Sequence, residues 1–240
     1  MPTRALAVLS LAAVLAGAAP ASAEIADKRG VFNGVEIHYK VLTPPGYDAR
    51  KAYPAILVFG GGPQTFEGAG RTIETDWKAE AEKRGYIVIS PAAPGEDLFY
   101  ERGDRIFPAF LNAIRRNYKI AGKLHVAGHS NGGLSAYHVA SRYPTYFSTV
   151  TGYPGLLDVE DQKGLAPLKG LCLFMHVGDQ DPFWWAAMDD QATTLKEQGA
   201  KIAFTVEKGQ GHRLQAPEIN LSPRLFDEIE SCSPGARAAK

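Results

Sequence analysis

One pentapeptide constrains the fold of this chain more than any other feature. Gly128-His129-Ser130-Asn131-Gly132 follows an apolar strand pattern at residues 124–127 and precedes a helical pattern. This order is typical of a nucleophile elbow, in which a sharp strand-to-helix turn pushes a serine hydroxyl out of the sheet. The crowded backbone accepts only glycine two residues before and two residues after the serine, and Gly128 and Gly132 meet that requirement. Ser130 is therefore the predicted nucleophile; a glycine-rich turn with a capping serine is the alternative for the pentapeptide alone.

The first 23 residues have the organisation of a secretory signal peptide. A basic residue, Arg4, precedes an apolar run from Ala5 to Ala19, and the segment ends in Ala21-Ser22-Ala23. This pattern predicts cleavage after Ala23. The apolar run is shorter than the roughly 20 residues that a membrane helix needs, and no later stretch approaches that length. We therefore expect a soluble protein without a membrane span, secreted or periplasmic after cleavage.

Length and charge limit the number of domains and the kinds of partner that the rest of the chain can have. Residues 24–240 are enough for one domain with a sizeable core, and residues 232–240 are expected to form a flexible tail. The full sequence has 26 basic and 26 acidic residues, so removal of Arg4 leaves a net charge near minus one. A near-neutral chain without basic clusters argues against nucleic acid or an anionic membrane as a partner.

Two cysteines, Cys172 and Cys232, follow the predicted signal peptide. An exported protein folds in an oxidising compartment, where a disulfide is stable. Cys172 lies at the start of a predicted strand and Cys232 at the end of the last predicted helix, and both should fall on the sheet face opposite the functional site. The sequence therefore favours a Cys172–Cys232 bond over a buried thiol and a free thiol in the tail.

The remaining sequence alternates predicted strands with predicted helices. Expected strands cover residues 35–42, 55–59, 86–90, 124–127, 147–151, 171–177 and 202–206. Expected helices cover residues 76–83, 106–117, 132–142, 186–198 and 223–230. Such alternation indicates an α/β fold with a mostly parallel sheet and helices on both faces. In these sheets ligands bind at the carboxyl ends of the strands.

Four loops with chemically active residues follow predicted strands and should converge at that edge. They are Gly60-Gly61-Gly62-Pro63, the turn at Ser130, Gly178-Asp179-Gln180-Asp181 and Gly211-His212. A serine hydroxyl attacks a carbonyl only when a neighbouring base removes its proton. His212 is the predicted base, because it lies late in the chain after a strand and follows the flexible segment Gly209-Gln210-Gly211. The other histidines lie on strands or in a helix, or, as with His129, point away from the serine.

A carboxylate must fix the tautomer of the base and stabilise its charged form. Asp179 and Asp181 both compete for this role, and the sequence favours Asp181 because Pro182 fixes a turn at that point. Backbone N–H groups must also face the oxyanion that forms during attack. Asn131 is expected to supply one, and the second should come from Gly62 or, as the alternative, Gly61. The glycine run could instead cradle a phosphate, but it lacks the Lys-Ser/Thr ending of a P-loop, and no metal-ligand spacing indicates a cofactor.

These motifs together resemble the α/β-hydrolase fold, and within it the secreted polyhydroxyalkanoate depolymerase and feruloyl esterase type of carboxylesterase. The landmarks span most of the chain and are Pro54 to Gly62, Lys123 to Gly133, Arg142-Tyr143-Pro144 with Phe147, His176 to Pro182, and Gly209 to His212. The resemblance implies a triad of Ser130, Asp181 and His212 without a large cap domain. It implies an oxyanion hole around Gly62 and Asn131.

The sequence therefore predicts a secreted, cofactor-free serine hydrolase that cleaves small or oligomeric carboxylic esters through an acyl-enzyme. A serine peptidase of the prolyl-peptidase type shares the fold and triad, and a non-catalytic binding protein on the same fold is a third reading. Aromatic residues near the expected site could line a pocket for the acyl group: Phe99, Tyr100, Phe183, Trp184 and Trp185. The alternative is that they pack the following helix onto the sheet.

Overall fold

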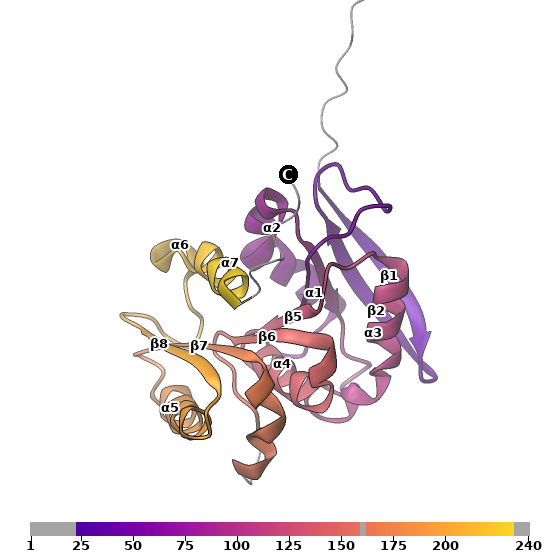
Figure 1. The fold of residues 1–240 in the computed structure, drawn as a ribbon. Helices are drawn as coiled ribbons and strands as arrows, with labels where there is room; N and C mark the ends of the chain where they lie inside the picture. The colour runs from indigo at the N-terminus through magenta and orange to yellow at the C-terminus, as the bar shows by residue number, and fades with distance from the viewer. Residues whose placement is uncertain (1–22, 159–161, 233–240) are drawn as a thin grey trace, which may run out of the picture.

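An eight-stranded sheet forms the centre of the structure, a computed structural model that describes residues 23–158 and 162–232 (Figure 1). The strand order is β1-β2-β4-β3-β5-β6-β7-β8. The strands are β1 (Glu24–Phe32), β2 (Val35–Thr43), β3 (Ala55–Phe59), β4 (Ile87–Pro91), β5 (Leu124–Gly128), β6 (Phe147–Gly152), β7 (Cys172–Gly178) and β8 (Lys201–Glu207). Strand β2 pairs antiparallel with β1 and β4, and all later pairings are parallel. The predicted signal peptide up to residue 22 and the tail from residue 233 lie outside the described residues.

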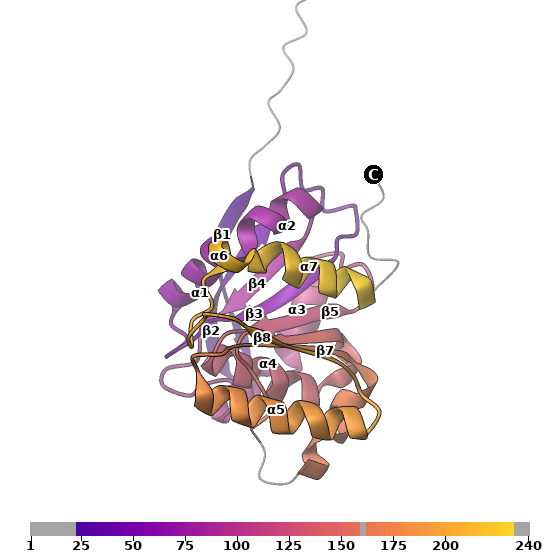
Figure 2. The ribbon, with the colours of Figure 1, turned by 90° about the vertical axis from the view of Figure 1, so that its left-hand side faces the viewer.

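Helices cover both faces of the sheet, as the sequence predicts (Figures 1 and 2). One face carries α1 (Phe66–Thr72), the π-helical segment η1 (Ile73–Trp77), α2 (Lys78–Arg84) and α7 (Leu221–Cys232). The other face carries α3 (Ala109–Asn117), α4 (Asn131–Arg142) and α5 (Pro182–Glu197). Shorter helical segments are η2 (Arg102–Ile106), η3 (Pro144–Tyr146), η4 (Gln162–Gly170) and α6 (Ala216–Ile219). None of the helices in the described part of the chain is both long enough and apolar enough to traverse a bilayer.

Each face of the sheet has its own apolar core. Beneath α3, α4 and α5, buried side chains such as Phe110, Tyr137 and Met188 pack against the sheet. On the opposite face, Trp77 and Phe226 belong to a second cluster. Because the middle strands are buried on both faces, they appear in the sequence as continuous apolar runs.

Strand β1 is absent from the elements that the sequence predicts. Its centre carries Asp27, Lys28 and Arg29, so no apolar alternation marks it, and it pairs only with β2 at the edge of the sheet. The hairpin turn between β1 and β2 is Asn33-Gly34, with both residues at positive φ, 50° and 79°. An Asn-Gly pair favours this turn, and it is the local signal that could have located the strand.

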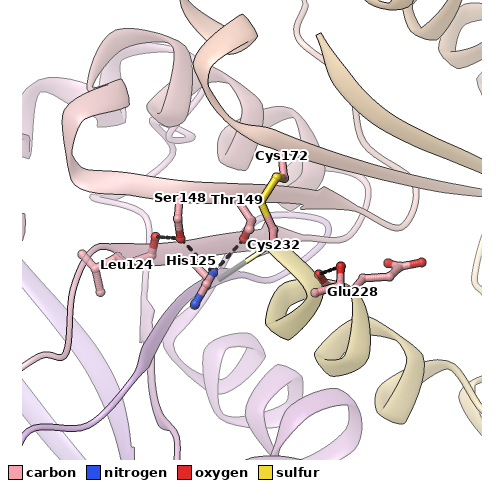
Figure 3. The surroundings of a disulfide bond; sticks show 8 residues. Leu124, His125, Ser148, Thr149, Cys172, Glu228 and Cys232 are labelled. Carbon is pink, nitrogen blue, oxygen red and sulfur yellow. Dashed lines mark hydrogen bonds between the residues drawn. A yellow bond between two sulfur atoms is a disulfide. The ribbon is translucent and has the colours of Figure 1, made fainter. Parts of the chain in front are cut away.

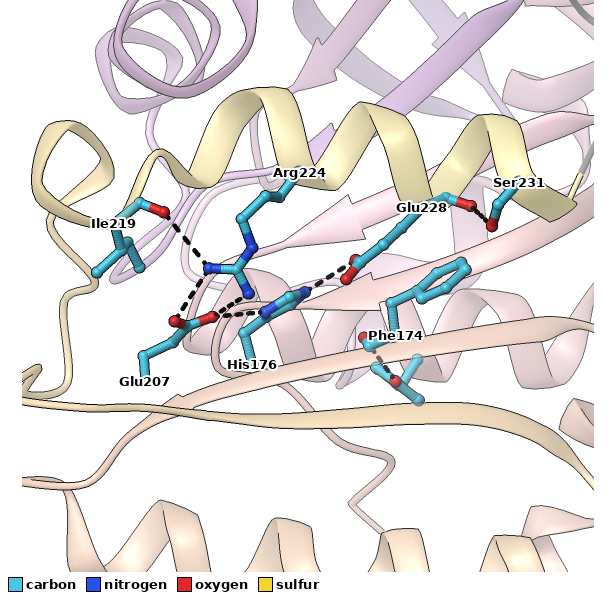
Figure 4. A network of polar contacts seen from close by, with 8 residues as sticks. Phe174, His176, Glu207, Ile219, Arg224, Glu228 and Ser231 are labelled. Atoms are coloured by element: carbon cyan, nitrogen blue, oxygen red, sulfur yellow. Dashed lines mark hydrogen bonds and ion pairs between the residues drawn. The ribbon is translucent and has the colours of Figure 1, made fainter.

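A buried ionic network joins α7 to strands β7 and β8 (Figure 4). His176 Nδ1 lies 3.0 Å from Glu207 Oε1, and its Nε2 lies 2.9 Å from Glu228 Oε2. Burial alone would lower the pKa of His176, but the two carboxylates outweigh that effect and raise it. Burial alone would raise the pKa of Glu207, but hydrogen bonds from His176 and Arg224 lower it to about 2. This network holds the carboxyl-terminal part of β8, which precedes the loop carrying His212.

The expected disulfide joins Cys172, the first residue of β7, to Cys232, the last residue of α7 (Figure 3). The two Cα atoms are 6.3 Å apart, and the bond closes a segment with a sequence separation of 60. Cys172 is at the amino-terminal end of β7, whereas Asp181 follows its carboxyl end. The bond therefore lies at the amino-terminal edge of the strands, remote from the functional edge.

Removal of this bond is expected to destabilise the protein without abolishing its activity at moderate temperature. A Cys172→Ala/Cys232→Ala variant should lose about 2 to 4 kcal/mol of unfolding free energy, because its unfolded chain is less restricted. Chemical denaturation of the oxidised protein and the variant measures this difference. Equal stability of the two proteins, or two free thiols in the non-reduced exported protein, would contradict the expectation.

Candidate active site

The nucleophile elbow has the strained backbone that its sequence predicts. Ser130 lies between β5 and α4 with φ 57° and ψ −121°, a combination that non-glycine residues rarely adopt. A Cβ atom added to Gly128 would lie 2.0 Å from the Gly132 carbonyl oxygen, and one added to Gly132 would lie 2.1 Å from that of Phe59. Backbone contact, rather than flexibility, therefore excludes any side chain at both glycines.

Three side chains from separate strand ends form one hydrogen-bonded chain. His212 Nε2 lies 2.8 Å from Ser130 Oγ, and His212 Nδ1 lies 2.6 Å from Asp181 Oδ2. The carboxylate accepts a hydrogen bond from Nδ1–H, which leaves Nε2 unprotonated and able to accept the serine hydroxyl proton. Asp181 is 9% exposed, whereas the His212 side chain is 43% exposed. The pair is therefore open to solvent on the imidazole side.

Asp179, the competing carboxylate, contacts the backbone instead of the imidazole. Its Oδ1 accepts a hydrogen bond of 2.8 Å from the N–H of Gly209, three residues before His212. The buried side chain of Gln210 fixes the same loop, because its Oε1 accepts from Gln215 N and its Nε2 donates to Glu218 Oε2. Asp179 thus holds the loop in place while Asp181 holds the ring. The sequence carries no local signal for the role of Gln210.

The glycine loop after β3 lies next to the elbow. Asn131 Nδ2 donates to the carbonyl oxygen of Gly62 at 3.0 Å, and Gly62 has φ 63°. Pro63 has no N–H, so the donors that this loop can offer an oxyanion are the N–H groups of its glycines, Gly61 and Gly62 among them. Gln64 is 2% exposed; its Nε2 donates to Ser135 Oγ at 2.8 Å and its Oε1 accepts from Phe99 N. Gln64, which sequence reasoning missed, therefore joins the glycine loop to α4.

The expectation that His129 points away from the serine is wrong. Its ring lies 5.4 Å from the ring of His212, and its Nε2 donates to the backbone carbonyl oxygen of His212 at 3.3 Å. Burial lowers the pKa of His129 to about 4, so the ring is neutral at physiological pH. Its Nδ1 side packs against Gly61, where an added Cβ would lie 2.6 Å away. His129 therefore contacts both the glycine loop and the His212 loop.

The five aromatic candidates separate into three groups. Phe99 is fully buried against Phe59 and Phe107, so its assignment to a substrate pocket is wrong. Tyr100 is half-buried in the turn before η2. The remaining three are in the first turn of α5, which begins four residues earlier than predicted because Pro182 suits a first helical position. Of these, Trp184 lies 5.4 Å from the His212 ring, whereas Phe183 and Trp185 are 88% and 37% exposed.

Comparisons with known proteins identify the family and the fold of this chain. The sequence model of a family described as "Putative esterase" matches residues 32–216. Dipeptidyl-peptidase 5 of Porphyromonas gingivalis is 30% identical over 135 residues, 51% of this chain and 20% of that protein. A solved ferulic acid esterase gives a TM-score of 0.69 at 18% identity, covering 86% of this chain and 98% of its own. A fungal esterase structure from Rhizomucor miehei gives a TM-score of 0.71 at 16% identity, covering 90% and 86%.

These matches differ in how much they show about the chain. The chain spans about a fifth of the length of the curated peptidases it matches, so it is similar to one part of them. The solved structures, at 16 to 18% identity, share the fold. Together with the strand order and the elbow, they confirm the predicted α/β-hydrolase fold. The family match covers most of the described chain, including Ser130 and His212.

Proposed function

Because this chain belongs to the esterase family, we propose that it is a hydrolase that cleaves carboxylic esters through a Ser130–His212–Asp181 triad. The observation that carries the proposal is the unbroken hydrogen-bonded chain from Asp181 through His212 to Ser130 at the elbow. The three groups stand at the distances that proton transfer needs. Ser130, His212 and Asp181 are arranged as a nucleophile, a general base and an orienting acid, respectively.

In the proposed reaction, Ser130 Oγ attacks the ester carbonyl while its proton moves to His212 Nε2. Asp181 stabilises the resulting imidazolium, which then gives the proton to the departing alcohol. The N–H of Asn131, with that of Gly62 or Gly61, stabilises the oxyanion of the tetrahedral intermediate. Water activated by His212 then hydrolyses the acyl-enzyme and regenerates the serine.

Export across a membrane is part of the proposal. The signal-peptide pattern supports it, and so does the disulfide, since such bonds persist in oxidising compartments. Strand β1 begins at Glu24, directly after the expected cleavage point, so cleavage there leaves every strand of the sheet intact.

Peptide hydrolysis is the second candidate activity, favoured by the match to dipeptidyl-peptidase 5. A substrate panel separates the two activities. We expect the protein to hydrolyse p-nitrophenyl and feruloyl esters and to leave aminoacyl and dipeptidyl p-nitroanilides intact. A fluorophosphonate probe should label Ser130, identified by peptide mass mapping. Faster turnover of the anilides than of the esters would replace the esterase proposal with a peptidase, and absence of both labelling and turnover would reject catalysis.

Trp184 is expected to contribute to ester selectivity. Its ring lies against His212, so its replacement by Ala should change relative kcat/KM among esters by about 10- to 200-fold. Phe183→Ala is a matched control, because this neighbour on the same turn is almost fully exposed. Kinetics with the ester panel and thermal melting test both variants. If Trp184→Ala lowers stability and leaves the order of substrates unchanged, the side chain only packs α5.

A further inference from the structure

A cavity of about 310 Å³ borders the proposed reaction site, and the ester chemistry leaves it unassigned. Gly61 and Gly62 of the glycine loop form part of its wall. So do His129 and Arg213, the chain neighbours of Ser130 and His212. The cavity therefore adjoins the loops that carry the proposed reaction.

Most polar groups of the cavity already have partners within the protein. The Tyr153 hydroxyl accepts from Trp77 Nε1 at 3.0 Å and donates to Asp76 Oδ2 at 3.2 Å. The other oxygen of Asp76 lies 2.8 Å from the hydroxyl of Thr75. His129 donates to the His212 carbonyl. These groups have little capacity left to recognise a ligand.

Two arginines lining the cavity retain free hydrogen-bonding capacity. Arg213 makes no hydrogen bond or ion pair with any residue in 23–158 or 162–232, although it acts electrostatically on Asp76 and Tyr153. Within the described ranges Arg71 makes one ion pair, 3.8 Å from Glu67, and both of those side chains are largely exposed. A guanidinium group carries five N–H donors and suits planar carboxylate or phosphate oxygens. The hydrogen-bonding capacity that remains in the cavity therefore consists of N–H donors on the two positively charged guanidinium groups.

The charge balance of the cavity favours an anion. Arg71 and Arg213 carry two positive charges against the one carboxylate of Asp76 among the described lining residues. Burial raises the pKa of Asp76, against the hydrogen bonds from Thr75 and Tyr153 that lower it. Tyr153 and His129 are neutral at physiological pH, since burial raises the pKa of the phenol and lowers that of the imidazole.

We propose that this cavity binds an anionic group, a carboxylate or a phosphate, carried by one half of the ester substrate, and that Arg213 and Arg71 recognise it. The inference rests on the proposed function, because the anion reaches the cavity as part of an ester held at Ser130. Trp184 also contacts the His212 ring and offers an apolar surface. The site then suits esters with one charged half and one apolar half.

Matched ester pairs test the inference on each half of the substrate. For the acyl half, the p-nitrophenyl monoester of adipic acid is compared with p-nitrophenyl octanoate. For the alcohol half, the butyrate ester of meta-hydroxybenzoate is compared with that of meta-hydroxybenzamide. The measured quantity is the ratio of kcat/KM for the anionic ester to that for its neutral partner. Competition by adipate and by inorganic phosphate against p-nitrophenyl butyrate then identifies which anion the cavity prefers.

Arg213→Gln and Arg71→Gln should each lower the anionic-to-neutral ratio of kcat/KM by about 10-fold or more, because a charge-assisted hydrogen bond is lost. This decrease should appear in one of the two ester pairs, the one whose charged half enters the cavity. Asp76→Asn should raise the same ratio, since it removes the opposing charge while keeping an oxygen that can accept from Tyr153. Arg116→Gln, on the exposed end of α3, is the control and should leave it unchanged. Unchanged ratios in both arginine variants, with the neutral esters still hydrolysed, would overturn the inference. A wild-type protein that hydrolyses neither neutral ester would instead reject the proposed function.

Discussion

Ser130→Ala is expected to fold as the wild type does and to lose nearly all ester turnover, a decrease of about 10³-fold or more in kcat. The alanine keeps the backbone and removes only the oxygen, 2.8 Å from His212 Nε2, that forms the acyl-enzyme. Labelling by the fluorophosphonate probe should disappear with the turnover. Stopped turnover together with an unchanged circular dichroism spectrum would separate chemistry from folding.

Two further variants sharpen this result. Ser141→Ala, on α4, should leave turnover and labelling unchanged, because the Ser141 hydroxyl donates a hydrogen bond to the carbonyl oxygen of His138. Ser130→Gly should be equally inactive yet more stable than Ser130→Ala, because glycine adopts φ 57° and ψ −121° without strain of about 1 to 3 kcal/mol. Labelling that survives in Ser130→Ala would show that another residue is the nucleophile.

Asp181→Asn should lower kcat by about 10²- to 10⁴-fold, because an amide can turn its N–H₂ toward His212 Nδ1 and stabilise the wrong tautomer. The effect should appear mainly in kcat, since Asp181 is almost buried behind the ring and does not face the substrate side. Measurement of kcat and KM with p-nitrophenyl butyrate checks this expectation.

Asp179→Asn is the matched comparison, two residues away on the same turn. The asparagine side-chain oxygen can still accept the hydrogen bond from Gly209 N–H, so the loop that carries His212 should stay in place. We expect a change in kcat within about 10-fold. A larger loss in Asp179→Asn than in Asp181→Asn would mean that the two carboxylates have exchanged roles in solution.

Local sequence pattern predicts most of the sheet and the place where its loops meet. Strands β3, β4 and β5 are short apolar runs between glycines and prolines, and their bounds differ from the predicted ones by at most one residue. Parallel strands bring their carboxyl ends to one edge, so the meeting of Ser130, Asp181 and His212 follows from topology. The elbow glycines fix the position of the serine within the turn, because backbone contacts at both glycines exclude every other residue.

The parts that escape prediction depend on contacts between residues far apart in the chain. Gln64 acquires its role from Ser135, 71 residues later, and nothing in the sequence around Gln64 marks that pairing. Phe99 follows a strand just as a pocket residue would, yet its ring is enclosed by Phe59 and Phe107. Which way a side chain turns at a strand end depends on the surrounding packing, and periodicity carries no information on it.

The segment that the disulfide closes contains part of the proposed catalytic triad. This segment, residues 172–232, contains both Asp181 and His212, whereas Ser130 lies outside it. Proteins open in cooperative units whose free energies lie below that of global unfolding. If this segment opens as such a unit, His212 and Asp181 are expected to separate from Ser130 while β2 to β6 stay paired, and catalysis is expected to stop without global unfolding. By restricting that opening, the bond should raise the temperature up to which the proposed triad stays assembled.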